Sequence, residues 1–530
     1  MSTFAPLSCD DIEQLIRLAP NKQSSLDPLP TWLLQSSAGE LAPLSTWLIN
    51  LSMSEGTVPT QLKIAVITPL VKKPALDSGD VRSYRPISNL SVISKLLERA
   101  VCKQLISYLN QNSLMPDSQS AYRAFHSAET AIAKVLGDIF TAIDSGDLSL
   151  LALLDLSAAF DTVDHDILLH RLHTSFGLSS TVHNWFQSYL TSRTQSVRCG
   201  TNASSTSVMT CGVPQGSVLG PILFLLYTSD VEEIIKCFDL ECHMYADDTQ
   251  TYGHCRPPAA TALHDNMERC IEEVAVWMRC NRLQLNASKT EFLWCSSSRR
   301  IHLHDRTSFH VGDDLVQPAS VVRDLGLYID EALTMTDHIN NLMRTCFGIL
   351  RQLKTIRRCL PLETTKMLIH SFISSRVDYC NVAFAGLPAS TLSRVQSVLN
   401  AAARLVCGAR KYDHVTPLLR DRLHWLRMPE HVTYKLCLLI YKCLHNLAPV
   451  YLSDAITPLS MVPSRQRLRS STSLDLLVSR TRTKIGERAF HVAGPAAWNS
   501  LPSDVQSAES LGTFKQRLKT HLFRKSYELD

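Results

Sequence analysis

The most constraining feature of this sequence is a pair of adjacent aspartates, Asp247 and Asp248. They lie in the segment HMYADDTQTY (243–252), where an apolar and aromatic stretch leads into a polar turn and a second strand-like stretch. Neighbouring carboxylates repel each other, and more strongly as they lose water. A divalent cation offsets this repulsion, because Mg²⁺ takes carboxylate oxygens together with phosphate oxygens. Since Asp-Asp is also common in solvated turns, the pair alone leaves both interpretations open.

A third carboxylate, Asp155, closes a short apolar run at 148–154. Such a run predicts a buried strand, and an acid at its end needs a partner. Asp155 with Asp247 and Asp248 gives three carboxylates on two strands. That number is sufficient for two Mg²⁺ ions in an in-line phosphoryl displacement. The next acids fall in a stretch typical of a helix start, where capping or surface roles are expected: Asp161, Asp164 and Asp166.

Between these segments lies the glycine-rich stretch CGVPQGSVLGPILFLLYTSD, residues 211–230. Glycine allows the backbone to approach a ligand closely, and Pro221 suits the first turn of a helix. An ordinary loop before a core helix would have the same glycines. Gln215 is less usual in a plain turn, because its amide offers both a donor and an acceptor to a base pair.

Seven segments in a fixed order carry a family resemblance. The strings FDxVDH, VPQGSVLGP, YADD, LNxxKT and DLGLYID follow SYRPISNLSVISKLLERAV (83–101) and SQSAYRAFHSAETAI (118–132). This series resembles the palm and finger motifs of reverse transcriptases from non-LTR (LINE-type) retrotransposons. The strings HNLAPVYLSD and TRTKIGERAFHVAGPAAWNSLP extend the resemblance toward the C-terminus without indicating any chemistry. One departure is Ala121-Tyr122-Arg123, where many relatives have Gly-Phe-Arg.

The resemblance implies a role for each matching residue. Asp155, Asp247 and Asp248 would hold two Mg²⁺ ions, with Mn²⁺ as an alternative ion. Phe160 would crowd a 2′-hydroxyl and so favour dNTPs, although a core aromatic is an equal alternative. Lys289 would donate a proton to departing pyrophosphate. The remaining assignments are nucleotide binding by Lys72, Arg85, Gln215 and Gly216, with Lys63 and Lys73 as further triphosphate candidates, and a primer grip at Leu325 and Gly326.

Composition is that of a globular protein with several subdomains. The 530 residues are 45% hydrophobic and 19% charged. No apolar run reaches the length of a membrane span, and the N-terminus lacks a secretory signal. The 16 cysteines form no CxxC pair, which favours reduced thiols in the cytoplasm or nucleus. Cys437, Cys443 and His445 are too few for a zinc knuckle and are expected in the core.

The net charge of +4 conceals an asymmetry along the chain. Residues 341–530 contain 28 Lys and Arg against 12 Asp and Glu, whereas residues 1–340 are acidic overall. A basic region beside an acidic catalytic body suits a protein that holds phosphate backbones in one part and metal ions in another. Basic side chains that only solubilise surface helices are the alternative.

The expected fold is α+β: a right-hand polymerase with fingers, a palm built on an antiparallel sheet, and a helical thumb. The predicted regions are a helical extension at 1–60 with breaks at its prolines, fingers and palm at 61–330, a thumb at 331–409 and a mostly helical basic region at 410–530. Residues 263–283 have helical periodicity and would back the palm sheet. The Ser-, Arg- and Pro-containing segment 458–473 predicts a mobile linker.

The predicted function is RNA-directed DNA polymerase of a retrotransposon, with an RNA template, a DNA primer and dNTPs as partners. A non-catalytic RNA-binding relic and an RNA-dependent RNA polymerase are the alternatives. The chain is expected to lack the upstream endonuclease domain usual in full-length elements, and so to be a fragment that does not retrotranspose alone. No RNase H motif set is apparent, and the sequence leaves the oligomeric state open.

Overall fold

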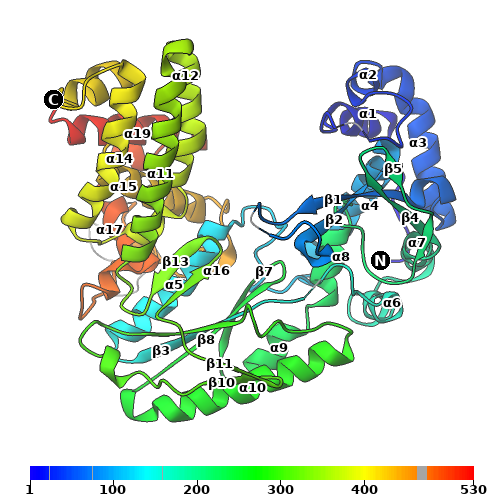
Figure 1. The fold of residues 1–530 in the computed structure, drawn as a ribbon, viewed down its shortest axis with the longest axis horizontal. Coiled ribbons are helices and arrows are strands. Elements are labelled where there is room, and N and C mark those ends of the chain that lie inside the picture. Colours follow the sequence, from blue (N-terminus) through cyan, green and yellow to red (C-terminus); the bar gives the residue numbers. More distant parts are fainter. Residues whose placement is uncertain (23, 75, 158, 462–473, 530) are drawn as a thin grey trace. The chain divides into compact units, whose positions relative to one another are not determined.

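The computed structural model describes residues 1–22, 24–74, 76–157, 159–461 and 474–529 in two compact units (Figure 1). Unit 1 comprises Met1–Tyr122, Asp155–Ile235 and Glu272–Asn286; unit 2 comprises Arg123–Leu154, Lys236–Ile271 and Ala287–Asp530. Each unit combines helices with strands, as the sequence predicts. Most of the linker predicted at 458–473 lies outside the described residues.

The N-terminal part of unit 1 is helical. Its helices are α1 (Cys9–Arg17), α2 (Thr31–Ser36) and α3 (Ala38–Glu55). Of its predicted breaks, those at Pro20 and Pro28–Pro30 separate α1 from α2. The Ser8 hydroxyl accepts a hydrogen bond from the Asp11 amide, and the Asp11 carboxylate accepts one from the Ser8 amide. This reciprocal cap starts α1. At the other end of the segment, Gly56 adopts φ +67°, a left-handed conformation that terminates α3.

The sheet of unit 1 has the order β2-β1-β4-β5, with β6 paired to β4. Antiparallel pairing of β1 and β2 places Leu70 opposite Arg85, while β1 and β4 run parallel. The strands are β1 (Ile64–Val71), β2 (Tyr84–Asn89), β4 (Arg193–Cys199), β5 (Asn202–Ala203) and β6 (Ser207–Met209). The remaining helices that start in unit 1 are α4 (Val92–Gln111), α6 (His165–Thr174), α7 (Ser180–Leu190), α8 (Gly220–Tyr227) and α9 (Val231–Lys236).

A four-stranded antiparallel sheet in the order β7-β8-β3-β9 forms the centre of unit 2. Its strands are β7 (Glu241–Tyr245), β8 (Asp248–Cys255), β3 (Leu148–Leu154) and β9 (Glu291–Cys295). All but one residue of β3 is buried, in agreement with its largely apolar sequence, and the one polar residue, Ser149, donates a hydrogen bond to the Gly253 carbonyl at 3.0 Å. Helix α5 (Ala128–Asp144) contacts β3, β7 and β8. Leu263 of α10 (Ala260–Cys280) packs against Gly253 of β8, so this helix backs the sheet as predicted.

The C-terminal helices of unit 2 share one hydrophobic core with the sheet and α5. Two small hairpins precede them, β10 (Phe309–Val311) with β11 (Asp314–Val316) and β12 (Val321–Asp324) with β13 (Leu327–Asp330). The helices are α11 (Thr336–Ile356), α12 (Leu362–Ile369), α13 (Ser375–Val377), α14 (Ala389–Cys407), α15 (Met428–Leu444), α16 (Val450–Ser453), α17 (Phe490–Asn499), α18 (Ser503–Gln506) and α19 (Leu511–Ser526).

The segment TRTKIGERAF, to which the sequence assigned no chemistry, has a clear packing role. The buried Arg488 guanidinium donates hydrogen bonds to the carbonyl oxygens of Leu333, Ala383 and Ala385, and it lies 4.6 Å from the centre of the Phe140 ring. The Asp144 carboxylate accepts hydrogen bonds from the backbone amides of Arg482 and Thr483. These contacts fasten the segment to α5 and to the loops beside α11 and α14.

Cys437 and Cys443 are buried in α15, as expected for core residues, whereas His445, also expected in the core, is exposed at the end of this helix. All sixteen cysteines are free thiols. In the described part of the chain, no helix combines the length and the apolar character needed to cross a membrane.

Candidate active site

Asp247 and Asp248 lie at the tip of the β7–β8 hairpin in unit 2. Tyr245 pairs with Asp248, so Ala246 and Asp247 form a two-residue turn. Ala246 has φ +60°, a left-handed conformation that non-glycine residues rarely adopt outside turns and functional sites. Asp247 is half-buried and Asp248 is exposed. The turn therefore presents two successive carboxylates without burying either of them fully.

Asp155 directly follows the last residue of β3. The register of the sheet places Leu154 of β3 opposite Thr249 of β8, the residue after Asp248. Asp155 itself belongs to unit 1, is half-buried, and accepts a hydrogen bond of 2.9 Å at its carbonyl oxygen from the Asn286 amide. The buried strand predicted from the sequence is thus present and ends immediately before the acid.

The donor chemistry of these aspartates suits a hard divalent cation, because carboxylate oxygens are the ligands that Mg²⁺ prefers. Across the described ranges, no three His, Cys, Asp or Glu side chains converge closely enough to form a preassembled metal site. The fit to Mg²⁺ therefore rests on the type of donor that the hairpin presents.

The glycine-rich loop 212–220 of unit 1 is held by backbone hydrogen bonds at its N-terminal end and near its middle. The Gly212 amide donates to the Val163 carbonyl at 2.7 Å, and the Val213 amide to the Phe160 carbonyl at 2.8 Å. Near the middle of the loop, the Ser88 amide of β2 donates to the Gln215 carbonyl at 2.7 Å. Gly216 has φ +118°, and a Cβ atom there would lie 2.8 Å from the Ser88 carbonyl oxygen. Only glycine permits this close approach of loop and strand.

A buried carboxylate holds the C-terminal end of the same loop. The Glu98 carboxylate of α4 is 1% exposed and accepts hydrogen bonds from the Val218 amide at 2.5 Å and the Leu219 amide at 3.2 Å. Burial raises the pKa of Glu98, whereas the nearby Arg193 guanidinium and these amides lower it. Arg193 is also 1% exposed and donates to the Tyr189 carbonyl at 3.1 Å. Helix α4 therefore fixes the loop through charge as well as packing.

Phe160 and Asp161 lie against this loop. The Phe160 ring stacks on Phe224 of α8 with centroids 4.8 Å apart, yet Phe160 remains only half-buried. One face of the ring therefore packs in the core while the other is accessible. Both interpretations of Phe160, as a core aromatic and as a residue that excludes a 2′-hydroxyl, stay open. The Asp161 carboxylate accepts hydrogen bonds from Nε2 of Gln215 at 3.1 and 3.2 Å.

Asp161, Asp164 and Asp166 were expected to cap a helix or lie on its surface, and only Asp161 has a different role. Asp164 caps α6 by accepting from the amides of Asp166 and Ile167 at 3.0 and 3.1 Å, which confirms that expectation. Asp166 is exposed in the first turn of α6, as predicted. Asp161 instead bonds the Gln215 side chain, 54 residues away in the sequence.

The basic residues predicted to bind triphosphate differ in accessibility. Arg85 is exposed on β2. Lys72 and Lys73 follow β1 and are exposed; Nζ of Lys72 donates to the Arg82 carbonyl at 2.9 Å. The prediction that Lys63 binds triphosphate is wrong, because this residue is only 7% exposed. Its Nζ donates a hydrogen bond to Ser188 Oγ at 3.3 Å, and burial lowers the pKa of Lys63. The buried Lys63 ammonium is not available to a triphosphate.

Lys289, Leu325 and Gly326 lie in turns of unit 2. Lys289 is exposed in the turn before β9. Leu325 and Gly326 form the two-residue turn between β12 and β13, with φ +43° and +89°, which matches the mirror-image turns that hairpins favour. The Tyr379 hydroxyl donates to the Leu325 carbonyl at 2.6 Å and so fixes this turn.

Asp324 lies beside that turn, and the sequence motifs did not indicate a role for it. Its carboxylate is 3% exposed and accepts a hydrogen bond of 2.6 Å from Nε2 of Gln250 on β8. Burial raises the pKa of Asp324 to about 7, the Gln250 hydrogen bond opposes this shift, and the negative charge of Asp248 adds to it. Glu98, Asp161 and Asp324 share one sequence signal, because each lies inside one of the segments that carry the family resemblance.

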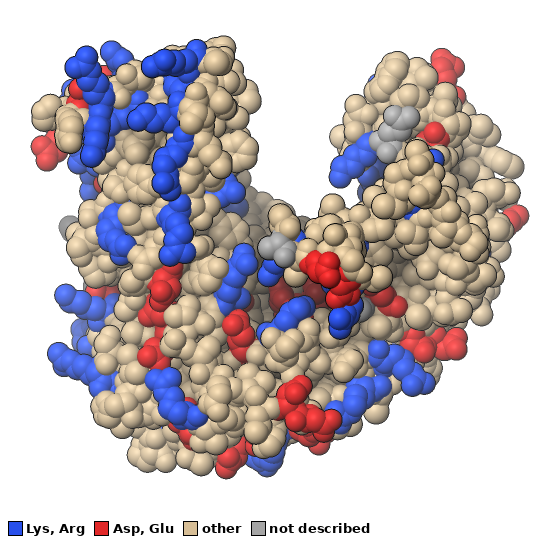
Figure 2. All heavy atoms as spheres, in the orientation of Figure 1, with Lys and Arg blue, Asp and Glu red and all other residues tan. Residues whose placement is uncertain are grey.

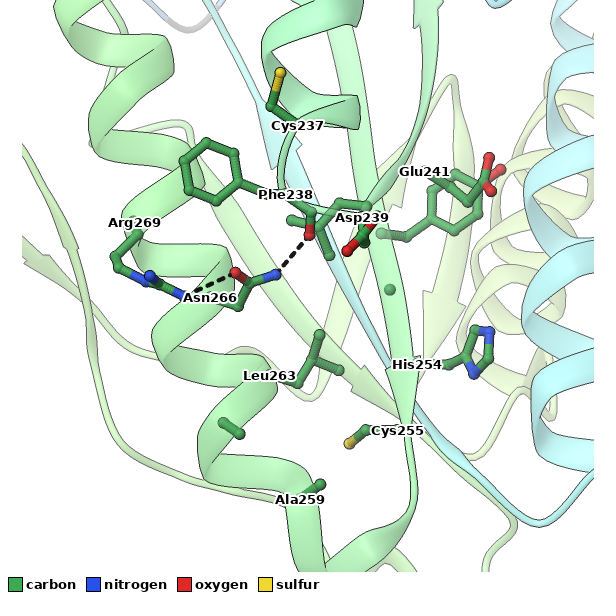
Figure 3. A pocket seen from close by; sticks show the side chains of 14 residues that line it. Cys237, Phe238, Asp239, Glu241, His254, Cys255, Ala259, Leu263, Asn266 and Arg269 are labelled. Atoms are coloured by element: carbon green, nitrogen blue, oxygen red, sulfur yellow. Dashed lines mark hydrogen bonds between the residues drawn. The ribbon is translucent and has the colours of Figure 1, made fainter.

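A separate cavity of about 600 Å³ lies along β8 and α10 in unit 2 (Figure 3). Asn266 and Arg269 project from α10 at its edge; Asn266 donates to the Phe238 carbonyl at 2.7 Å and accepts from Arg269 at 3.0 Å. None of the predicted site residues lines this cavity.

Comparison with known protein families gives a match to part of this chain. Residues 71–329 match the family described as reverse transcriptase (RNA-dependent DNA polymerase). This range contains the Asp247–Asp248 hairpin, the glycine-rich loop and Asp155. The region 71–329 therefore belongs to the reverse transcriptase family.

Curated relatives narrow the resemblance to retrotransposon polymerases of the non-LTR type. The chain is 27% identical over 428 residues to the probable RNA-directed DNA polymerase from transposon X-element of Drosophila melanogaster, covering 79% of this chain and 46% of the relative. It is 25% identical over 446 residues to the RNA-directed DNA polymerase from mobile element jockey of Drosophila funebris, covering 80% and 47%. The chain thus spans about half the length of the relatives it matches.

Solved structures give a weaker likeness. Apo telomerase from Candida tropicalis aligns with a TM-score of 0.39 and 12% identity, over 70% of this chain and 63% of that chain. Telomerase from Candida albicans in complex with a TWJ fragment of telomeric RNA aligns with a TM-score of 0.37 and 12% identity, over 76% and 71%. At these scores the likeness supports no conclusion about this chain.

Proposed function

We propose that this chain is an RNA-directed DNA polymerase of a non-LTR retrotransposon, with the right-hand organisation expected from its motifs. The observation that carries the proposal is the strand register of unit 2. It aligns the end of β3, immediately before Asp155, with the start of β8, immediately after the Asp247–Asp248 turn. Family membership of residues 71–329 supports the same assignment.

In the proposed reaction, the primer 3′-hydroxyl oxygen attacks the α-phosphorus of a dNTP, a new P–O bond forms, and the bond to the β-phosphate breaks. Asp155, Asp247 and Asp248 would hold two Mg²⁺ ions, or Mn²⁺ in their place. When bound, these ions would lower the charge on the phosphates and favour the deprotonated hydroxyl. The three carboxylates would orient this centre.

Other residues would bind and orient the nucleotide. The exposed Arg85 guanidinium suits bidentate contact with phosphate, and Lys72 adds a second cation in the same unit. Phe160 would exclude a 2′-hydroxyl. The loop containing Gln215 and Gly216 would face the nucleotide and its templating base, held in place by β2 and α4. Lys289 would protonate departing pyrophosphate, and the Leu325–Gly326 turn would position the primer.

The basic helices of unit 2 suit the phosphate backbones of the RNA template and DNA primer. Figure 2 shows Lys and Arg side chains gathered over the C-terminal helices of unit 2, at the upper left of the view. Arg344 and Arg351 are exposed on α11, and Arg358 is exposed just beyond it. The spacing of seven residues aligns them along one side of the helix. A non-catalytic RNA-binding relic would retain this surface, and it is the second candidate.

Polymerase assays with a matched variant separate the two candidates. Purified protein is given a primed RNA template, dNTPs and Mg²⁺, beside Asp247→Ala. Asp313→Ala is the control, because Asp313 is an exposed aspartate in another two-residue hairpin turn of unit 2, between β10 and β11. Incorporation by wild type and the control, but not by Asp247→Ala, supports the polymerase. RNA binding without incorporation by any of the three proteins supports the relic.

A further inference from the structure

The side chains of Asp161 and Gln215 form a contact that the polymerase assignment does not include. Both carboxylate oxygens of Asp161 lie within hydrogen-bonding distance of Nε2 of Gln215, at 3.1 and 3.2 Å. Both residues are half-buried in unit 1. An ionised carboxylate only accepts hydrogen bonds, so it selects the NH₂ end of the amide and not the carbonyl end.

The backbone beneath this pair is already fixed. The Val213 amide donates to the carbonyl of Phe160, the residue before Asp161. A Cβ atom on Gly212 would lie 2.8 Å from the Asp161 carbonyl oxygen, so chain and loop are in direct contact there. Because both backbones are held, little further conformational entropy is lost when the two side chains bond.

Two neighbouring groups oppose the effect of burial on Asp161. Burial raises the pKa of Asp161, whereas the Gln215 hydrogen bond and the positive charge of Lys72 lower it. Lys72 is also a candidate for binding phosphate. One cluster in unit 1 thus contains a cation, a carboxylate and the amide of the glycine-rich loop.

We propose that Asp161 is a positioning residue that fixes the amide orientation of Gln215. With Nε2 bound to Asp161, Oε1 of Gln215 is the acceptor that the side chain offers to a donor group on the sugar or base of a nucleotide. Asp161 acts through Gln215 and does not touch the nucleotide itself. The nucleotide part of this inference rests on the proposed function, whereas the amide orientation does not.

A double-mutant cycle tests whether Asp161 acts through Gln215. Steady-state constants for dNTP incorporation are measured for wild type, Asp161→Ala, Gln215→Ala and the double variant. Losing a hydrogen bond to a charged group predicts that Asp161→Ala raises KM for dNTP about tenfold, with a smaller change in kcat. In the Gln215→Ala background, Asp161→Ala should add nothing. An equal further loss in that background overturns the proposal.

Two more variants separate hydrogen bonding from charge. Asp161→Asn keeps an acceptor for Nε2 and should recover most of the wild-type KM. Asp166→Ala removes an exposed acid in the first turn of α6 and should leave KM unchanged. If Asp161→Asn is as impaired as Asp161→Ala, charge and not amide orientation is responsible, and the proposal is overturned.

A spectroscopic readout keeps this test separate from the proposed function. In protein labelled with ¹⁵N-glutamine, the Gln215 side-chain signal is identified by its loss in Gln215→Ala. That signal should shift in Asp161→Ala and stay close to its wild-type position in Asp161→Asn. An unshifted signal in Asp161→Ala overturns the amide orientation. Wild-type protein that incorporates no dNTP overturns the polymerase assignment, while the signal still reports on the Asp161–Gln215 bond.

Discussion

Gln250 of β8 donates a hydrogen bond of 2.6 Å to Asp324 of β12, and the two side chains are 1% and 3% exposed. Gln250 is two residues from Asp248, and Asp324 directly precedes the Leu325–Gly326 turn. The bond therefore joins the hairpin that carries the two aspartates to the hairpin proposed to hold the primer. Both hairpins belong to unit 2, so one buried bond sets their relative position.

Asp324 should make the stability of unit 2 depend on pH. Burial raises its pKa from 3.8 to about 7 in the folded state. Between these values the folded protein retains a proton that the unfolded chain has lost, so stability should fall as pH rises from about 4 to 7. Asp324→Asn should remove up to about 4 kcal/mol of this dependence. Urea unfolding of both proteins at pH 5 and pH 8 measures it; parallel losses in wild type and variant would contradict the assignment.

Removing Glu98 should destabilise unit 1 strongly. Glu98→Ala removes the acceptor of the Val218 and Leu219 amides, and with it the negative charge near the buried Arg193. Each buried amide left without its acceptor costs about 1–3 kcal/mol. Glu98→Gln keeps an acceptor for the amides and should cost less. Chemical denaturation compares the two, and a loss below about 1 kcal/mol in Glu98→Ala would show that these hydrogen bonds do not hold the loop.

Gly216→Ala should displace the glycine-rich loop from β2. The new Cβ atom would meet the Ser88 carbonyl oxygen at 2.8 Å, in addition to the strain of φ +118°. Gly200→Ala is the matched control, because Gly200 also has a positive φ, +61°, but a Cβ there meets nothing within 4 Å. Both variants should lose about 1–3 kcal/mol from backbone strain, whereas only Gly216→Ala should also lose dNTP incorporation. Equal activity in the two variants would refute a role for the close approach.

Phe160→Ala should admit ribonucleotides. The exposed face of Phe160 is the part proposed to exclude a 2′-hydroxyl, while its other face packs on Phe224. Preference for dNTP over rNTP should fall roughly 10- to 100-fold, measured as the ratio of the two kcat/KM values. Phe372→Ala removes a partly exposed aromatic ring of unit 2 and should leave the ratio unchanged. A variant that still rejects rNTPs would assign Phe160 to core packing alone.

The basic face of α11 should contribute to the salt dependence of RNA binding. Replacing Arg344, Arg351 and Arg358 with Gln should reduce the slope of log affinity against log salt by about 2, since each phosphate contact with single-stranded RNA contributes about 0.7. A triple replacement of exposed cations in unit 1, Arg17, Lys22 and Lys103, carries the same charge change and should leave the slope unaltered. Equal slopes in both triple variants would exclude this face as the RNA-holding surface.

Residues 410–530 share a hydrophobic core with the preceding helices of unit 2, so deleting them would not test RNA binding alone. Tyr441, Trp498 and Phe514 are buried with the helices that precede residue 410. A deletion would expose those helices and change folding together with binding.

Features that depend on local order along the chain could be predicted without the structure. A continuous apolar run predicted the buried strand β3, the Asp247–Asp248 pair predicted a turn, and Asp164 was recognisable as a helix cap. These features follow from periodicity, turn chemistry and capping, which act within a few residues. The ordered motifs also identified the reverse transcriptase family.

Contacts between groups that are distant along the chain could not be predicted in this way. The Glu98 carboxylate reaches an amide 120 residues away, Asp161 bonds a side chain 54 residues away, and Arg488 reaches a carbonyl 155 residues away. Packing also buried Lys63, which the sequence offered as a surface cation. Burial and long-range hydrogen bonds arise when separate elements pack together, and neither leaves a periodic signal in the sequence.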